Sequence, residues 1–315
     1  MRFHLRIVSV LAVMLTSALA GPGAYAAFRV ALVDRFYPGD YALPKAMEQD
    51  LLNSLYGMVD LDRDRSREPL YHGDVVEMLL AHPDIQVLRY PLPGDRTPMQ
   101  GILQQLRKVH DDARDHPIDA VLLPWESSTL ISSLEPRTTL DNPRPLRAEA
   151  VERYVETVRA WGEDSEVWAV THDIIRALEA LSATGMKVYT IAGNGGRGMV
   201  NTFSFANDVT TVGASERELA NFVSNNAFVD EREQAAYLFR RVDGSDGAPL
   251  GYDLDDDGCP EVSLRHLTGY SESRRDYPRE GWRALKGSSF AAPRALRRFL
   301  VGAAPPSFCV SPVGS

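Results

Sequence analysis

The feature that most constrains the fold is a series of short apolar runs that alternate with amphipathic segments. The run IDAVLLPW (118–125) is almost wholly apolar, as a strand buried on both faces of a sheet would be. Similar strand-like runs occupy 28–34, 85–93, 186–193 and 208–215. Strands of this kind occur in parallel sheets whose two faces are covered by helices.

Helices are predicted between these runs. Ile102, Leu103, Leu106 and Val109 fall on one face of the segment 101–116, which is the pattern of an amphipathic helix. Further helices are predicted at 72–83, 148–161, 168–185 and 290–302. We therefore expect an α/β fold of three layers, with a mostly parallel sheet and helices on both faces.

The first 26 residues have the pattern of a secretory signal peptide. Arg2 and Arg6 precede the apolar run IVSVLAVMLTSALA, and AYA (24–26) places small residues at a cleavage site. A membrane anchor is the alternative, but the apolar run is shorter than the roughly 20 residues that span a bilayer. No later apolar run is long enough to span one, so no membrane association is expected after removal of the signal peptide. A secreted or periplasmic protein is predicted, with one domain over 27–315 and a loop-rich insertion near 230–276, where Pro, Gly and charged residues gather.

Charge and cysteine content narrow the class further. The chain has 34 basic and 43 acidic residues and a formal net charge of −9, which disfavours binding to nucleic acid or anionic lipid. Its two cysteines, Cys259 and Cys309, suggest one disulfide in an exported protein. Two buried thiols are the alternative.

Four polar residues of complementary chemistry stand at the ends of predicted elements. Asp34 ends the first strand, His72 begins a helix, Asn194 follows the fourth strand and Ser289 precedes the last helix. A serine becomes a nucleophile when a neutral imidazole takes its proton, and a carboxylate orients that imidazole. An amide beside them stabilises the charge that develops on a carbonyl oxygen.

Each of these residues also has a plain structural interpretation as a turn acid, a helix-start histidine, a turn asparagine or a cap. Together, however, they resemble the subtilisin-like serine peptidases (subtilases). The order Asp, His, Ser is the one found in subtilisin. YHGDVVEMLLAH, MKVYTIAGNGG with DVTTVGAS, and GSSFAAP are similar to that family's His, Asn and Ser motifs. The resemblance implies Asp34, His72 and Ser289 as the catalytic triad, Asn194 as the oxyanion donor, and Ser288 as a packing or capping neighbour.

The chain departs from the family pattern in several places. Arg35 and Phe36 follow Asp34 where the family has Ser/Thr-Gly, and Asp74 and Val75 replace the threonine and second histidine of the His motif. Pro124, Trp125 and Glu126 stand where the family has Ser-Leu-Gly in the strand that pairs with substrate, and we expect Trp125 and Glu126 to narrow or charge the specificity pocket. The family's long propeptide does not fit between the predicted cleavage site and Asp34. Three alternatives follow: the chain folds unaided, it uses a separate inhibitor or folding partner, or it is not a standard protease.

The acidic run DLDDDGCPE predicts a calcium site. Asp253, Asp255, Asp257 and Glu261 surround Gly258, and Ca²⁺ prefers several hard oxygen ligands in a tightly turning loop. Position 12 of an EF-hand loop would be Leu264, so the segment is not a complete EF-hand. A solvated acidic loop is the alternative interpretation.

Two other functions compete with peptide hydrolysis. GNGGRG (193–198) matches a dinucleotide motif, but the residues after it have no helical period, so no organic cofactor is expected. The fold can also serve as a binding protein with little or no hydrolysis. The residues favour a serine endopeptidase that acts on a protein or peptide substrate.

Overall fold

The computed structural model describes residues 27–36, 70–94, 96–135, 146–238, 240–254, 258–263 and 283–302 of the chain. Its main sheet contains β1 (Phe28–Asp34), β2 (Ile85–Pro91), β3 (Ala120–Leu123), β5 (Lys187–Ile191), β7 (Val209–Ala214) and β8 (Glu231–Glu233). The strand order is β2-β1-β3-β5-β7-β8, and every neighbouring pair is parallel. The predicted parallel sheet is confirmed.

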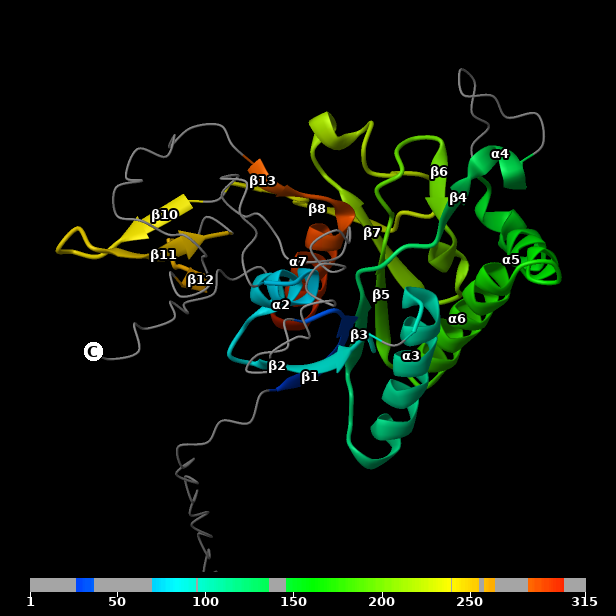
Figure 1. The fold of residues 1–315 in the computed structure, drawn as a ribbon, viewed down its shortest axis with the longest axis horizontal. Coiled ribbons are helices and arrows are strands. Elements are labelled where there is room, and N and C mark those ends of the chain that lie inside the picture. Colours follow the sequence, from blue (N-terminus) through cyan, green and yellow to red (C-terminus); the bar gives the residue numbers. More distant parts are fainter. Residues whose placement is uncertain are drawn as a thin grey trace, which may run out of the picture.

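Helices cover both faces of this sheet (Figure 1). One face packs against α2 (His72–Leu80) and α7 (Ser288–Val301), and the other against α3 (Pro98–Asp115), α5 (Val151–Trp161) and α6 (Glu166–Ala183). Successive strand residues point to opposite faces, so Leu32 lies in the core beside α2 and α7 while Val33 lies in the core beside α3 and α6. The three-layer α/β class is therefore confirmed.

The predicted helices occur close to their expected positions, with differences at their ends. Helix α3 begins at Pro98 because Thr97 caps it: Thr97 Oγ1 accepts a hydrogen bond from the Gln100 backbone N–H at 3.4 Å. Proline suits the first helical turn, where its missing N–H would have no partner. Ahead of α5, the residues Ala148–Ala150 form a 3₁₀ turn.

The segment 230–276, predicted to be rich in loops, contains strands in its described part. Besides β8 it contributes β9 (Ala236–Leu238), β10 (Arg240–Asp243), β11 (Pro249–Asp253) and β12 (Val262–Ser263). The last three form an antiparallel sheet, and β9 pairs with β13 (Arg283–Lys286) next to the start of α7. A strand therefore leads directly into the turn that bears Ser289.

The remaining short elements lie beyond the carboxyl ends of the main strands. Strand β4 (Ser128–Leu130) pairs in antiparallel fashion with β6 (Met199–Asn201). They are accompanied by α4 (Ile131–Leu134) and by 3₁₀ turns at Thr202–Phe205 and Arg217–Leu219. This pairing ties the segment after β3 to the segment after β5.

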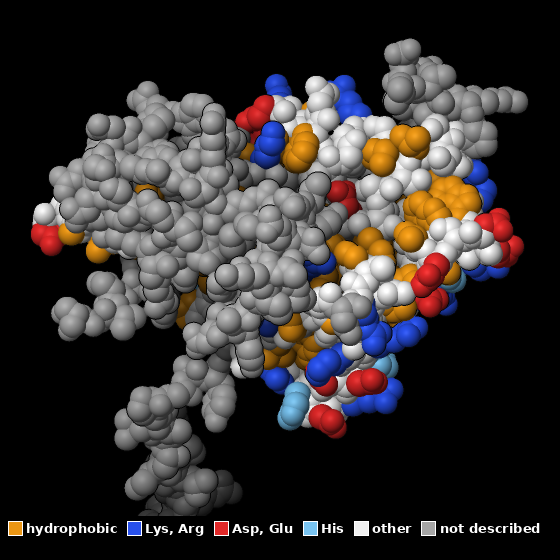
Figure 2. All heavy atoms as spheres, viewed as in Figure 1, with side chains coloured by type: hydrophobic (Ala, Val, Ile, Leu, Met, Phe, Trp, Pro, Cys, Tyr) orange, Lys and Arg blue, Asp and Glu red, His pale blue; other side chains and the backbone are white. Residues whose placement is uncertain are grey.

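Basic and acidic side chains are mixed over α3, α5 and α6 in the view of Figure 2. Such mixing is typical of helices that turn one apolar face to the core and the other to water. Among the described helices, none combines the length and apolar character needed to cross a bilayer. The predicted signal peptide at 1–26 lies outside the described residues.

Candidate active site

The structure brings Asp34 and His72 into direct contact. Asp34 is the last residue of β1 and is fully buried, and His72 is the first residue of α2. His72 Nδ1 lies 2.7 Å from Asp34 Oδ2. A carboxylate accepts, so the ring carries its proton on Nδ1, which leaves Nε2 as the atom able to take a proton.

Gly73 permits this close approach. A Cβ atom at Gly73 would lie 2.6 Å from the Arg35 carbonyl oxygen and 2.8 Å from Asp34 Cβ. The Gly73 N–H also donates to the Arg35 carbonyl oxygen at 2.9 Å, which joins the start of α2 to the end of β1. The His-Gly pair of the sequence is therefore a packing requirement as well as part of a motif.

The pKa of His72 is raised above its ordinary value of 6.5. Burial lowers it, since burial disfavours the charged ring, but the negative charge of Asp34 and the hydrogen bond to it outweigh this effect. The imidazole is thus a stronger base than a free histidine, as a proton acceptor for a serine hydroxyl should be.

The other carboxylate oxygen of Asp34 is also occupied. Oδ1 accepts from the Arg35 backbone N–H at 2.7 Å and from Trp125 Nε1 at 2.9 Å. Trp125 was predicted to shape the specificity pocket, but its indole is only 4 % exposed and lies against the acid. The structure thus places the Trp125 indole in contact with Asp34, and its burial does not fit the predicted role in the pocket.

Ser289 lies in the first turn of α7. It is 5 % exposed, and the ring of the following residue, Phe290, lies 5.4 Å from the His72 ring between centroids. In the described part of the chain, no hydrogen bond joins the Ser289 hydroxyl to His72. Bonds of this kind commonly shorten only when substrate binds.

Asn194 is held in one orientation by Ser288. Its Oδ1 lies 3.0 Å from the Ser288 backbone N–H and 3.1 Å from the Ser288 hydroxyl. A backbone N–H can only donate, so the contacting atom is the amide oxygen and the Asn194 NH₂ group remains as a donor. This is the arrangement that an oxyanion donor needs.

Ser288 does more than the expected capping or packing. The cap residue of α7 is Gly287, whereas the buried Ser288 hydroxyl accepts from the Gly193 N–H at 3.1 Å as well as contacting Asn194. Gly287 has φ 151°, and a Cβ there would lie 3.3 Å from the Asn194 amide. The two turns that carry Asn194 and Ser289 are therefore interlocked.

Glu126 lies on the same turn. Its Oε2 accepts from the Asn194 backbone N–H at 2.8 Å and from Ser128 Oγ at 2.7 Å. A Cβ at Gly193 would lie 2.3 Å from this oxygen, so glycine makes room for the carboxylate. The role of Glu126 in charging the specificity pocket stays a prediction.

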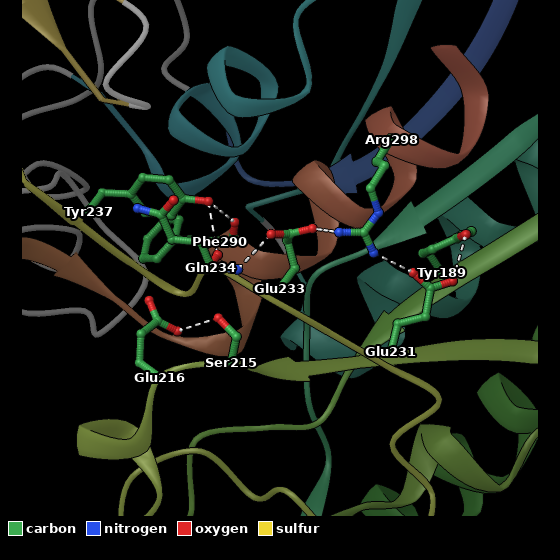
Figure 3. A network of polar contacts seen from close by, with 9 residues as sticks. All are labelled: Tyr189, Ser215, Glu216, Glu231, Glu233, Gln234, Tyr237, Phe290 and Arg298. Carbon is green, nitrogen blue, oxygen red and sulfur yellow. Dashed lines mark hydrogen bonds and ion pairs between the residues drawn. The ribbon is translucent and has the colours of Figure 1, made fainter. Parts of the chain in front are cut away.

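Behind the site, a polar network fixes α7 (Figure 3). The Tyr237 hydroxyl lies 3.1 Å from the Phe290 carbonyl oxygen, and the Gly287 N–H donates to the Ala235 carbonyl oxygen at 2.8 Å. Further along the helix, Arg298 pairs with Glu231 and with Glu233 of β8. Helix α7, which bears Ser289, is thus attached at both its start and its end.

The acidic loop is only partly described. Asp253 Oδ2 accepts from the Gly258 N–H at 2.8 Å, and Glu261 Oε2 accepts from the Leu254 N–H at 2.6 Å, so both acids help to close the loop. Asp255 and Asp257 lie outside the described residues. No group of three potential metal ligands occurs among the described residues, and the calcium site stays a prediction.

The predicted disulfide also stays a prediction. Cys259 is 8 % exposed, within the same loop as Asp253 and Glu261. Cys309 lies outside the described residues.

No protein-family model and no curated protein matches the chain. Among solved structures it is similar to a lanthipeptide protease, with 16 % identity over 87 % of this chain and 72 % of that chain and a TM-score of 0.41. It is also similar to the nisin leader peptidase NisP from Lactococcus lactis, with 12 % identity over 86 % of this chain and 76 % of that chain and a TM-score of 0.43. A third similar structure is the PatG macrocyclase in complex with peptide, with 11 % identity over 87 % of this chain and 74 % of that chain and a TM-score of 0.42.

Proposed function

We propose that the chain is a serine endopeptidase that hydrolyses peptide bonds with Asp34, His72 and Ser289. The observation that carries the proposal is the 2.7 Å hydrogen bond between Asp34 and His72, which leaves His72 Nε2 as a base beside the helix start that bears Ser289. The fixed amide of Asn194 supports it.

In this mechanism His72 Nε2 takes the proton of the Ser289 hydroxyl as Ser289 Oγ bonds to the substrate carbonyl carbon. Asn194 Nδ2 and a backbone N–H at the start of α7 donate to the oxygen that becomes negative. His72 then passes its proton to the departing amine. Water, activated by the same imidazole, hydrolyses the acyl-enzyme.

Further properties belong to the same proposal. The substrate is a peptide or protein, and export to the periplasm or the medium follows from the predicted signal peptide. Ca²⁺ would bind as a structural ion at Asp253, Asp255, Asp257 and Glu261. A separate inhibitor or folding partner belongs to the same proposal.

A fluorophosphonate probe tests the proposal. The wild-type protein should be labelled, with the label mapped to Ser289 by mass spectrometry, and Ser289→Ala should abolish both labelling and peptide hydrolysis. In subtilisin, loss of the serine costs about 10⁶ in kcat. A folded wild type that takes no label and cleaves no peptide would support the alternative, a protein that only binds.

A further inference from the structure

Trp125 reaches the buried carboxylate of Asp34 from the side opposite His72. The indole Nε1 donates to Oδ1 at 2.9 Å, while His72 occupies Oδ2 at 2.7 Å. Trp125 is 4 % exposed and Asp34 is fully buried, so the contact is shielded from water. Hydrogen bonds to an ionised group are stronger than neutral ones, and low local polarity strengthens them further.

The backbone around Trp125 is itself fixed. Asn201, which is fully buried, donates from Nδ2 to the Trp125 carbonyl oxygen at 3.2 Å and to the Ile191 carbonyl oxygen at 2.7 Å. Its Oδ1 accepts from the Ser127 N–H at 3.0 Å. The segment that bears the indole is thus attached to the end of β5, and the position of the indole is set by the sheet.

We propose that Trp125 is a positioning residue of the triad, which holds the Asp34 carboxylate with Oδ2 toward His72. This inference rests on the proposed peptidase function. Two donors on Oδ1, the Arg35 N–H and the indole N–H, oppose rotation of the carboxylate. The partial positive charge of the indole N–H also weakens the electrostatic effect of the Asp34 carboxylate on His72.

Among the described residues, α2 carries the charged side chains of Asp74 and Glu77, and the two elements packed against it, β1 and α7, carry those of Arg29, Asp34, Arg294, Arg297 and Arg298. Arg35 directly follows β1, and Arg89 lies on β2. Asp74 and Glu77 both pair with Arg89 of β2. Arg297 of α7 contacts the Ala81 carbonyl oxygen at the far end of α2. These pairs do not involve the indole. The Arg35 guanidinium lies 5.9 Å from the centre of the Trp125 ring, over a face that phenylalanine would retain.

The substitution Trp125→Phe removes the donor and keeps an aromatic ring. We expect kcat/KM on its pH plateau to fall about tenfold, the lower range for loss of a hydrogen bond to a charged group, with little change in KM. The acid limb of the profile should move to higher pH, because Asp34 then acts on His72 without the opposing N–H. Equal plateaus and equal limbs in wild type and Trp125→Phe would overturn the proposal.

Trp161→Phe is the matched control. Trp161 lies at the end of α5 and packs against Trp168, with ring centroids 4.9 Å apart and away from the triad. Both variants lose a similar volume, so a purely structural effect would lower stability in either one. A shifted pH profile is expected for Trp125→Phe and not for Trp161→Phe.

NMR separates failure of this inference from failure of the proposed function. The pKa of His72, read from its imidazole signals, should be higher in Trp125→Phe than in wild type, whether or not either protein cleaves peptides. In ¹⁵N-tryptophan-labelled wild type, the Trp125 indole N–H signal should move as His72 titrates, and the Trp161 signal should not. This second measurement needs no folded variant, and an indole signal insensitive to that titration would overturn the proposal.

Discussion

Ser288 donates both its backbone N–H and its hydroxyl toward Asn194 Oδ1, at 3.0 and 3.1 Å. The residue that precedes the proposed nucleophile therefore orients the proposed oxyanion donor. A shift of the α7 start would move both groups together. This coupling keeps the donor and the nucleophile in fixed relation, which is the condition for electrostatic stabilisation without reorganisation.

Asn194→Ala should lower kcat with little change in KM, because the amide is expected to meet the negative charge only in the transition state. Loss of one such donor in subtilisin costs about 10²–10³ in kcat. Steady-state kinetics on a peptide substrate provides the measurement. A loss confined to KM would assign Asn194 to substrate binding.

Ser288→Ala should keep probe labelling at Ser289 and reduce kcat about tenfold, since Asn194 Oδ1 keeps the backbone donor and loses the hydroxyl. The Gly193 N–H also loses its acceptor, which should lower the free energy of unfolding by about 1–3 kcal/mol. Ser288→Thr, which retains the hydroxyl, is the control and should behave like wild type. If Ser288→Ala ends labelling while Ser289→Ala keeps it, the assignment of the nucleophile is wrong.

The pH dependence of activity should reflect the raised pKa of His72. The base must be neutral, so kcat/KM should fall as pH drops through a value above 6.5. The effect on stability has the opposite sign: the contribution of His72 to the free energy of unfolding is complete below about pH 6.5 and is lost as pH rises through the raised pKa. Activity that persists unchanged to about pH 4 would indicate a carboxylate base.

Ca²⁺ should raise the melting temperature if the acidic loop binds it, by mass action on the folded state. Asp255→Ala should remove that gain. Asp246→Ala is the control, because Asp246 lies in the turn between β10 and β11, where it accepts from the Ala248 N–H at 3.0 Å. A melting temperature indifferent to Ca²⁺ and to chelator would leave the loop as a solvated surface.

Much of the fold was predictable because local patterns determine it. Apolar runs such as 118–125 have the composition and length of strands in a covered sheet, and the spacing of apolar residues in 101–116 predicts the face of an amphipathic helix. Asp34, His72, Asn194 and Ser289 stood out because they fall at the ends of elements, where functional residues gather in parallel α/β sheets.

The contacts of Trp125 and Ser288 were not predictable from the same patterns. Trp125 lies 91 residues from Asp34 in sequence. Because it stands where the family has its substrate-pairing strand, the sequence predicted that it shapes the specificity pocket. Only the packed structure shows the indole turned toward the acid. The hydroxyl of Ser288 likewise has partners 94 and 95 residues away. The preference of serine for helix caps suggested that Ser288 caps the last helix, but such a preference carries no information about contacts with distant residues.

The attachment of α7 to β8 and to the Tyr237 segment has a consequence for the order of events during synthesis. Proteins are made from the N-terminus, so β1, α2 and the Asn194 turn leave the ribosome before α7. A growing chain therefore carries Asp34, His72 and Asn194 before it carries Ser288 and Ser289. On the proposed function, peptide hydrolysis becomes possible only when α7 packs against β8 and the Tyr237 segment. A nascent chain that has not yet formed α7 would therefore not cleave other proteins.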